Sequence, residues 1–204
     1  MATFTQQIFG GLNIGMLVGD GFEQDELRLP RQALEEVGAI VKVLAHKSGT
    51  VQGMHQGQTG DAVTVDLSFD KARADDFDAL LVLGSTANAD ALCLDPDAQR
   101  LVKNTDKEGK PIGMIGPAAW LMLTAGLVKG RTLTGPDGLA AEVTKAGGHW
   151  RHKNLVVDNN WVSSHRPADL AAFTEHFKTV LGQRVKASVK GTADGLPGAA
   201  GMGG

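Results

Sequence analysis

The sequence predicts an α/β fold, a doubly wound sandwich in which helices cover both faces of a mostly parallel sheet. The prediction depends on two observations. Short, almost fully apolar runs alternate with amphipathic stretches of helical spacing, and this alternation is typical of parallel strands joined by helical crossovers. The 204 residues, of which 42% are hydrophobic, are enough for one ordinary domain of this kind.

The first strand–helix–strand unit is the clearest. The apolar run Leu12–Val18 predicts a buried strand, which ends at the glycines on either side of Asp20. Glu26–Val37 has apolar residues at helical spacing and predicts a helix that ends at Gly38. A second strand is predicted immediately afterwards, over Ala39–Ala45.

The rest of the chain continues the alternation after a polar, glycine-rich loop or small hairpin over 46–63. The further predicted elements are a strand over Phe77–Leu83, a helical stretch over Ala87–Lys107, a strand over Pro111–Ile115, a helix over Pro117–Ala125, a long strand or strand pair over Leu155–Ser163 and a final helix over Pro167–Leu181. We therefore predict a domain over 12–182, after an N-terminal extension (1–11) and before a Gly/Ala-rich tail (183–204) that we predict to be disordered.

Composition excludes several classes of protein. The formal net charge is −3, and no basic stripe suggests a nucleic-acid partner. No apolar run approaches the roughly 18–20 residues that span a bilayer, and the N-terminal residues lack the pattern of a secretory signal. The sequence thus predicts a cytoplasmic protein without a membrane partner.

Neither the cysteine nor the histidines form a recognisable chemical motif. Cys93, the only cysteine, lies on an apolar helical face with no base nearby, and we predict an ordinary packed thiol. His149 and His152 have a spacing that could hold a metal on a helix, but their segment is typical of a turn leading into a strand. We predict no metal site and no cofactor.

A series of motifs resembles the ThiJ/PfpI superfamily, also called DJ-1/PfpI. In chain order they are GDGFEQDELRLPRQALEEVGA, DFDALLVLGS, GKPIGMIGPAAWLMLTAGLVKGRTLT, KAGGHW and LVVDNNWVSSHRPADL. Several motifs in the same order are far more specific than any one of them. The resemblance implies a flavodoxin-like sandwich, similar to class I glutamine amidotransferases, that forms a homodimer or a higher homo-oligomer.

The resemblance also places a nucleophile elbow after the strand that follows Gly-Lys-Pro. In the family this turn usually reads Ile-Cys-His-Gly-Pro, with the cysteine at a helix N-terminus that lowers its pKa. Here Gly116 and Pro117 stand in place of the cysteine and the histidine. Glycine relieves the strain of the turn and proline suits the first position of a helix. The resemblance therefore implies that the family's thiol chemistry is absent.

Other family positions retain polar groups. Glu23 matches the acid that hydrogen-bonds the cysteine, and Gly84-Ser85 matches the Gly-Gly turn whose amides can hold an anion. Asp90 falls near the acid or histidine that another subunit often contributes. His165 replaces an arginine of the family's Ser-Arg-x-Pro stretch and could approach the pocket as a base.

Two functions follow from these positions. The first is a family member without catalytic cysteine, a stress-related, chaperone-like or ligand-binding homo-oligomer with a possible small-molecule ligand; the cysteine-free C-terminal domains of large catalases are a precedent. The alternative is a cysteine-independent hydrolase or lyase, protease-, glyoxalase- or deglycase-like. In that case Glu23 would be the acid/base, and His165 or Asp90 would assist it.

Overall fold

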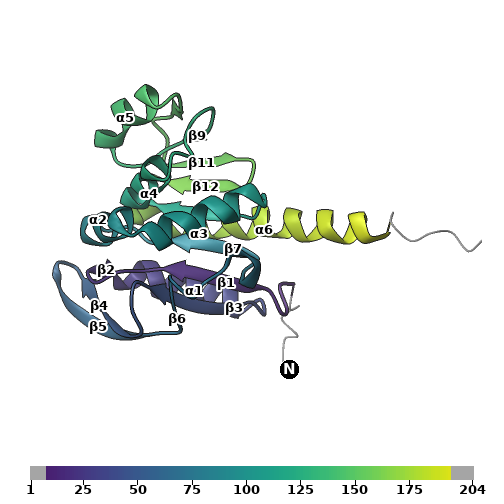
Figure 1. The fold of residues 1–204 in the computed structure, drawn as a ribbon, viewed down its shortest axis with the longest axis horizontal. Helices are drawn as coiled ribbons and strands as arrows, with labels where there is room; N and C mark the ends of the chain where they lie inside the picture. The colour runs from purple at the N-terminus through teal and green to yellow at the C-terminus, as the bar shows by residue number, and fades with distance from the viewer. Residues whose placement is uncertain (1–7, 194–204) are drawn as a thin grey trace, which may run out of the picture.

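The structure, a computed structural model, describes residues 8–193 and confirms the predicted α/β fold (Figure 1). A seven-stranded sheet lies at its centre, with the strand order β11-β12-β8-β7-β1-β3-β6. All neighbouring pairs in this sheet are parallel except β11 and β12. The seven strands are β1 (Asn13–Leu17), β3 (Ile40–Ala45), β6 (Leu67–Ser68), β7 (Ala79–Val82), β8 (Ile112–Ile115), β11 (Leu155–Asp158) and β12 (Trp161–Ser164).

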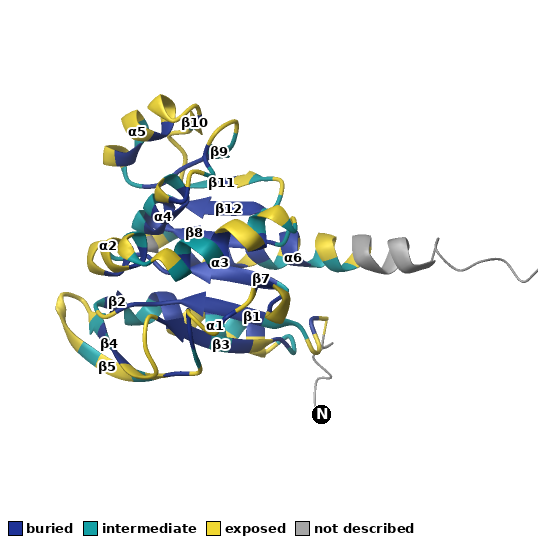
Figure 2. Cartoon of the chain, in the orientation of Figure 1, coloured by how far each residue is buried: buried dark blue, intermediate teal, exposed yellow. Residues whose placement is uncertain are grey.

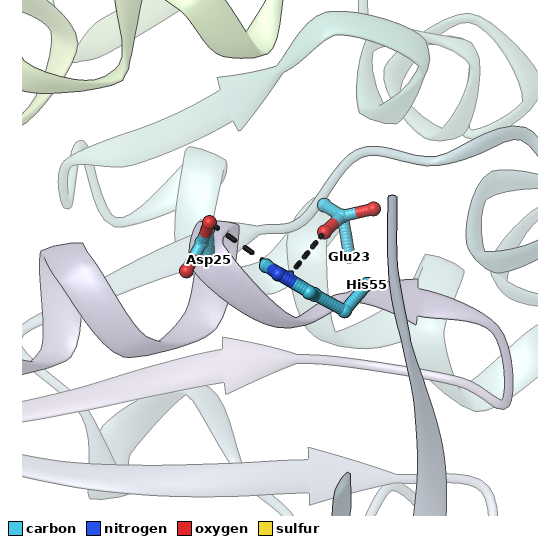
Figure 3. Close-up of side chains that lie close together, drawn as sticks. All are labelled: Glu23, Asp25 and His55. Carbon is cyan, nitrogen blue, oxygen red and sulfur yellow. Dashed lines mark ion pairs between the residues drawn. The ribbon is translucent and has the colours of Figure 1, made fainter. Parts of the chain in front are cut away.

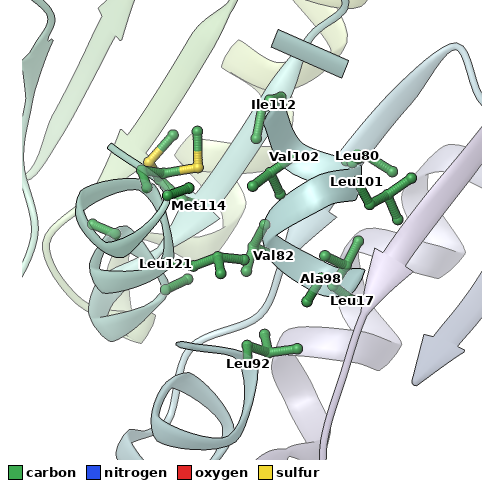
Figure 4. Close-up of a cluster of buried hydrophobic side chains, with 14 of the residues drawn as sticks. Leu17, Leu80, Val82, Leu92, Ala98, Leu101, Val102, Ile112, Met114 and Leu121 are labelled. Carbon is green, nitrogen blue, oxygen red and sulfur yellow. The ribbon is translucent and has the colours of Figure 1, made fainter. Parts of the chain in front are cut away.

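Helices cover both faces of the sheet, as the alternation predicts. One face packs against α2 (Thr86–Leu94), α3 (Pro96–Lys107) and α4 (Ala119–Thr124), and the other against α1 (Gln24–Glu35) and α6 (Leu170–Ala193). Side chains alternate along β1, so that Leu17 joins the first core and Met16 the second. Figure 4 shows part of the first core, where apolar side chains of β1, β7 and β8 pack against those of α2, α3 and α4.

Burial follows this arrangement of one sheet between two layers of helices (Figure 2). The central strands β7 and β8 are buried along their whole length, since helices cover them on both sides. The exposed residues gather on the outer faces of the helices and on the hairpin of β4 and β5.

Two smaller sheets lie beside the central one. The first joins β2 (Phe22–Glu23), β4 (Gly49–His55) and β5 (Gln58–Val65), and the second pairs β9 (Thr132–Leu133) with β10 (His149–Trp150). Helix α5 (Ala140–Lys145) leads into β10. Four short 3-10 turns complete the described chain: η1 (Ala74–Asp76), η2 (Gly116–Ala118), η3 (Asp137–Leu139) and η4 (Pro167–Asp169).

Where the sequence left alternatives open, the structure decides between them. The polar segment after β3 forms the β4–β5 hairpin, and 155–164 forms an antiparallel strand pair. The single helical stretch predicted over Ala87–Lys107 divides into α2 and α3. The division falls at Asp95, whose side chain accepts hydrogen bonds from two amides of α3, and at Pro96, which suits the first helical turn.

The final helix extends beyond its predicted end at Leu181. Gly182 lies within α6, which continues to Ala193, so residues 183–193 of the predicted tail are helical. The residues after Gly182, Gln183–Lys186, favour a helix and outweigh the single glycine. The remainder of the predicted tail, 194–204, and residues 1–7 of the extension lie outside the described residues.

No helix within residues 8–193 is both long and apolar enough to cross a bilayer.

Candidate functional site

The turn after β8 forms the centre of the candidate site. Gly116 adopts φ +50° directly after the strand, and Pro117 follows within η2, which leads into α4. A Cβ at Gly116 would meet only the backbone oxygen of His165, at 3.5 Å. The turn therefore has the abrupt strand-to-helix form expected of a nucleophile elbow, with no side chain at position 116 and room for one. That this position corresponds to the family's cysteine stays a prediction.

A buried carboxyl group, Glu26, lies beside this turn. It comes from α1 and is 1% exposed. A Cβ at Gly84 would lie 2.7 Å from the carbonyl oxygen of Ile115 and 2.8 Å from Oε2 of Glu26, so the carboxyl and the end of β8 flank the same glycine. The family motifs assign no role to this residue.

The environment of Glu26 favours its neutral form. Burial raises its pKa from 4.5 to about 7, a hydrogen bond of 2.6 Å from the Gly84 amide lowers it in part, and the charge of Glu23 raises it again. The second oxygen, Oε1, is buried without a hydrogen-bond partner among the described residues. Glu26 can therefore both accept and donate a proton near pH 7, which is the property required of a general acid/base.

The turn after β7 holds Gly84 and Ser85. The Gly84 amide binds Glu26, so it is not free to hold an anion. Ser85 adopts φ +68°, which is uncommon for a residue with a side chain. Its hydroxyl donates to the Gly21 carbonyl at 2.7 Å and accepts from the Asn88 amide at 3.1 Å, which caps α2.

Asn88 fixes this turn against the neighbouring strands and was also not identified from the sequence. It is fully buried, accepts a hydrogen bond from the Gly19 amide and donates one to the Leu83 carbonyl. These contacts join the carboxyl ends of β1 and β7, the edge at which ligands bind in open parallel sheets.

His165 lies next to the turn after β8, and its predicted role as a base stays a prediction. Its backbone oxygen is the nearest atom to a Cβ at Gly116, and its ring Nδ1 lies 2.5 Å from the Gly135 carbonyl oxygen. Because a carbonyl only accepts hydrogen bonds, Nδ1 carries the proton, and Nε2 of the neutral ring keeps its lone pair. A Cβ at Gly135 would lie 3.3 Å from the Gly116 oxygen, so the three residues are neighbours.

Glu23, the acid predicted from the family motif, belongs to a different group of side chains. Its Oε1 lies 3.8 Å from Nδ1 of His55, and Oδ2 of Asp25 lies 3.9 Å from the same nitrogen (Figure 3). One ligand atom from each of these residues lies within 4.8 Å of the others, a spacing at which a cation could be held. All three side chains are partly exposed, and such groups are common on protein surfaces without an ion.

Two further residues singled out by the sequence, Asp90 and Cys93, lie on α2. Asp90 is exposed on α2. Burial raises the pKa of the nearby Cys93 thiol, a contact with Thr124 lowers it in part, and the charge of Asp90 raises it again. At neutral pH this thiol stays protonated, so the structure gives Cys93 no features of an activated nucleophile.

Glu26 could have been recognised in the sequence from its position. It stands in the apolar stripe of α1, adjacent to Leu27 and in helical register with Pro30 and Leu34. A carboxylate at a position that helical spacing assigns to the core requires compensation, and such groups cluster at functional sites. Its motif also contains Glu23, three residues earlier, which the family resemblance favours, whereas the helical spacing favours Glu26 as the buried acid.

The geometry defines a class of protein: a doubly wound sandwich with a candidate site at the carboxyl ends of its central strands. The family model described as the DJ-1/PfpI family matches residues 13–179. The chain belongs to the DJ-1/PfpI family.

Comparisons with individual proteins agree with this assignment. The chain is 35% identical over 170 residues to "Deglycase PfpI" of Pyrococcus furiosus, a match that covers 83% of this chain and 99% of that protein. It is 31% identical over 169 residues to YraA of Bacillus subtilis, provisionally named a cysteine protease, covering 82% of this chain and 97% of that one. A solved structure from Anabaena variabilis, a two-domain protein with DJ-1/ThiJ/PfpI-like and ferritin-like domains, superimposes on this chain with a TM-score of 0.78. The two chains are 25% identical, and the match covers 84% of this chain and 48% of that chain.

Proposed function

We propose that this protein catalyses a proton transfer on a small carbonyl adduct, as a deglycase-like enzyme without a cysteine nucleophile. The observation that supports the proposal most strongly is Glu26, a buried carboxyl with a pKa of about 7 beside an open strand-to-helix turn. Its similarity to proteins named deglycases favours this reaction class, and the substrate that we propose is an adduct of an α-oxoaldehyde with a thiol or an amine. This is the alternative function of the sequence analysis, with the acid/base moved from Glu23 to Glu26.

The proposed chemistry needs no covalent bond to the protein. In the adduct, a carbon that carries a hydroxyl group and the thiol or amine stands next to a carbonyl group. Ionised Glu26 removes the proton from the hydroxyl-bearing carbon, and the electron pair moves onto the carbonyl oxygen to give an enediolate. Return of the proton to the former carbonyl carbon, together with transfer of the hydroxyl proton to the enediolate oxygen, gives an α-hydroxyacyl product. Water hydrolyses this product to an α-hydroxy acid and releases the thiol or amine. A carboxyl with a pKa near 7 is available in both protonation states for these steps.

His165 has the position to assist as a positioning or proton-transfer group. Its Nδ1–H is held by the carbonyl of Gly135, which is itself a neighbour of Gly116. Nε2 is then the atom that can exchange a proton with the substrate's hydroxyl groups. The absence of a side chain at Gly116 leaves space for the substrate where the family would hold a thiol.

Turnover of the adduct of methylglyoxal with a thiol tests the proposal. We expect Glu26→Gln to lower kcat by about 100-fold or more, the usual contribution of general acid/base catalysis. Glu23→Gln removes the same charge from a partly exposed neighbour and is the matched control, with a change of only a few fold. Equal losses in both variants, or none in Glu26→Gln, would contradict the assignment of Glu26.

A second candidate function is a non-catalytic ligand-binding protein, favoured by the missing side chain at Gly116. The double substitution Gly116→Cys with Pro117→His distinguishes it from the first. An inert wild type together with an active double variant would show a former enzyme that retains its pocket, and would overturn the proposed catalysis. The predicted homo-oligomer stays a prediction that sedimentation of the purified chain would test.

A further inference from the structure

A small hollow next to the site is lined largely by basic side chains. Its volume is about 180 Å³, and the lining residues are Asp137, His152, Lys153, Asn154, His165 and Arg166. His165 belongs to both places, because its backbone oxygen faces Gly116 while the residue also lines the hollow. A molecule that occupies the turn after β8 could therefore extend one end into the hollow.

The hollow holds more positive charge than its own contacts neutralise. Lys153 and Arg166 are both exposed, and within residues 8–193 neither side chain forms a hydrogen bond or an ion pair. The one carboxylate of the lining, Asp137, lies 3.6 Å from His152 instead. The positive charges of Lys153 and Arg166 are therefore not neutralised within the hollow, because its one carboxylate pairs with a histidine.

The backbone that carries the cations is held firmly. The Lys153 carbonyl accepts a hydrogen bond of 2.7 Å from the hydroxyl of Thr134, which is fully buried. The amide of His165 donates one of 2.8 Å to the Asn154 carbonyl. The two segments that form the hollow are therefore joined to each other and to the core, which lowers the entropic cost of binding a ligand between them.

The size of the hollow limits its occupant. Pockets for whole organic ligands usually measure about 300–1,000 Å³, so a hollow of about 180 Å³ suits one end group and not a complete substrate. Paired lysine and arginine side chains suit a carboxylate or a phosphate, to which they form charge-assisted hydrogen bonds.

Resting on the proposed function, we infer that this hollow binds the anionic group, a carboxylate or a phosphate, of the carbonyl substrate. Lys153 and Arg166 bind the anion, while His165 separates it from the reacting carbon beside Glu26. The preferred substrates are then carbonyl adducts that carry a negative charge at the end remote from the reacting carbon.

Direct binding tests the hollow without requiring turnover. Calorimetric titrations at low ionic strength use inorganic phosphate in one arm and acetate in the other. We expect Lys153→Gln and Arg166→Gln each to weaken binding of the preferred anion about fivefold to tenfold, as loss of one charge-assisted contact should. Lys145→Gln removes an exposed cation of α5 outside the hollow and should leave the affinity unchanged. The arm that binds more tightly identifies the anion.

Two results would overturn the inference: neither anion binds at tens of millimolar, or the lining variants lose no more affinity than Lys145→Gln. Both lining residues are exposed, so their variants should fold, and an unchanged thermal midpoint checks this. If the enzyme is active, Arg166→Gln should raise KM for a carboxylate-bearing adduct with little change in kcat, and leave KM for the uncharged methylglyoxal adduct unchanged. Anion binding in a protein without turnover would instead support the hollow and contradict the proposed function.

Discussion

The turns after β7 and β8 lie at the same edge of the sheet, and they accommodate a residue with positive φ in different ways. Each reverses the chain abruptly between a buried strand and a helix, and each contains a residue with positive φ, Ser85 at +68° and Gly116 at +50°. Ser85 keeps a side chain there, and its hydroxyl forms two hydrogen bonds that hold the turn. Gly116 has no side chain, and nothing approaches the position that a Cβ would take more closely than 3.5 Å.

A glycine can be required at a turn either because φ is positive or because a Cβ would have no space, and the two turns distinguish these reasons. Positive φ alone does not demand glycine at this edge, because Ser85 tolerates it with the help of its hydrogen bonds. Nor is Gly116 forced by crowding. The crowded glycine is Gly84, whose missing Cβ gives room to the Ile115 carbonyl and to Glu26. We conclude that Gly84 is required by packing, whereas the empty position at Gly116 is available to a ligand.

Gly84→Ala should have the largest effect on stability. Its Cβ would lie 2.7 Å from a backbone oxygen and 2.8 Å from Glu26 Oε2, and the backbone cannot move aside cheaply. We expect the free energy of unfolding in urea to fall by about 3 kcal/mol or more. A loss below about 1 kcal/mol would show that the turn is less crowded than the comparison requires.

Glu26 should make stability depend on pH. Its folded-state pKa lies above the 4.5 of an ordinary carboxyl, so the folded protein binds more protons between pH 4.5 and about 7. The free energy of unfolding should therefore fall as pH rises through this window, by up to about 3 kcal/mol. Urea denaturation at several pH values measures this fall.

Glu26→Gln should remove most of that dependence, because the amide does not titrate. Glu23→Gln serves as the control again and should leave most of the fall in place, since the charge of Glu23 is the smallest of the three causes of the shift. A wild type whose stability is flat between these pH values would argue against a buried, titrating Glu26.

The sequence predicts the fold well because each main strand and helix is marked by a hydrophobic pattern within a short stretch of the chain. The apolar runs at β1, β3, β7 and β8 are strands buried by helices on both sides, so their composition identifies them without long-range information. The two-residue strands such as β2 and β9 could not be predicted, because each exists only through pairing with a distant partner.

The site was predicted less completely, for a related reason. Gly116 and His165 were found because a motif surrounds each, and the structure places them together. Glu26 and Asn88 were missed because their importance comes from burial and from contacts with Gly84 and Gly19, far away in sequence. The motif offered two acids three residues apart, and only the direction of the α1 face shows which one is buried.

Ser85→Ala tests how the turn after β7 tolerates its side chain. The substitution keeps the positive φ and removes both hydrogen bonds of the hydroxyl, so we expect a loss of about 1–2 kcal/mol in the free energy of unfolding. Ser85→Gly loses the same bonds but relieves the backbone, and should be about 1 kcal/mol more stable than Ser85→Ala. If both variants lose the same stability, Ser85 is not strained.

Gly116→Ala should have the smallest effect on stability and the most informative effect on function. Its Cβ would make only an ordinary contact with the His165 oxygen, so its cost is the strain of φ +50°, about 1 kcal/mol. Gly126→Ala is the matched control, because Gly126 has φ +74° and open space around it after α4. The two variants should lose similar stability.

Only the methyl group at position 116 should impair the site, because it fills space in the turn after β8, next to the His165 backbone oxygen. We expect Gly116→Ala to raise KM for the methylglyoxal adduct several fold, while Gly126→Ala leaves KM and kcat unchanged. If the two variants behave alike in both stability and kinetics, the space at Gly116 is not where the substrate lies. The turn after β8 would then be a structural counterpart of the turn after β7, and the substrate would have to reach Glu26 from another direction.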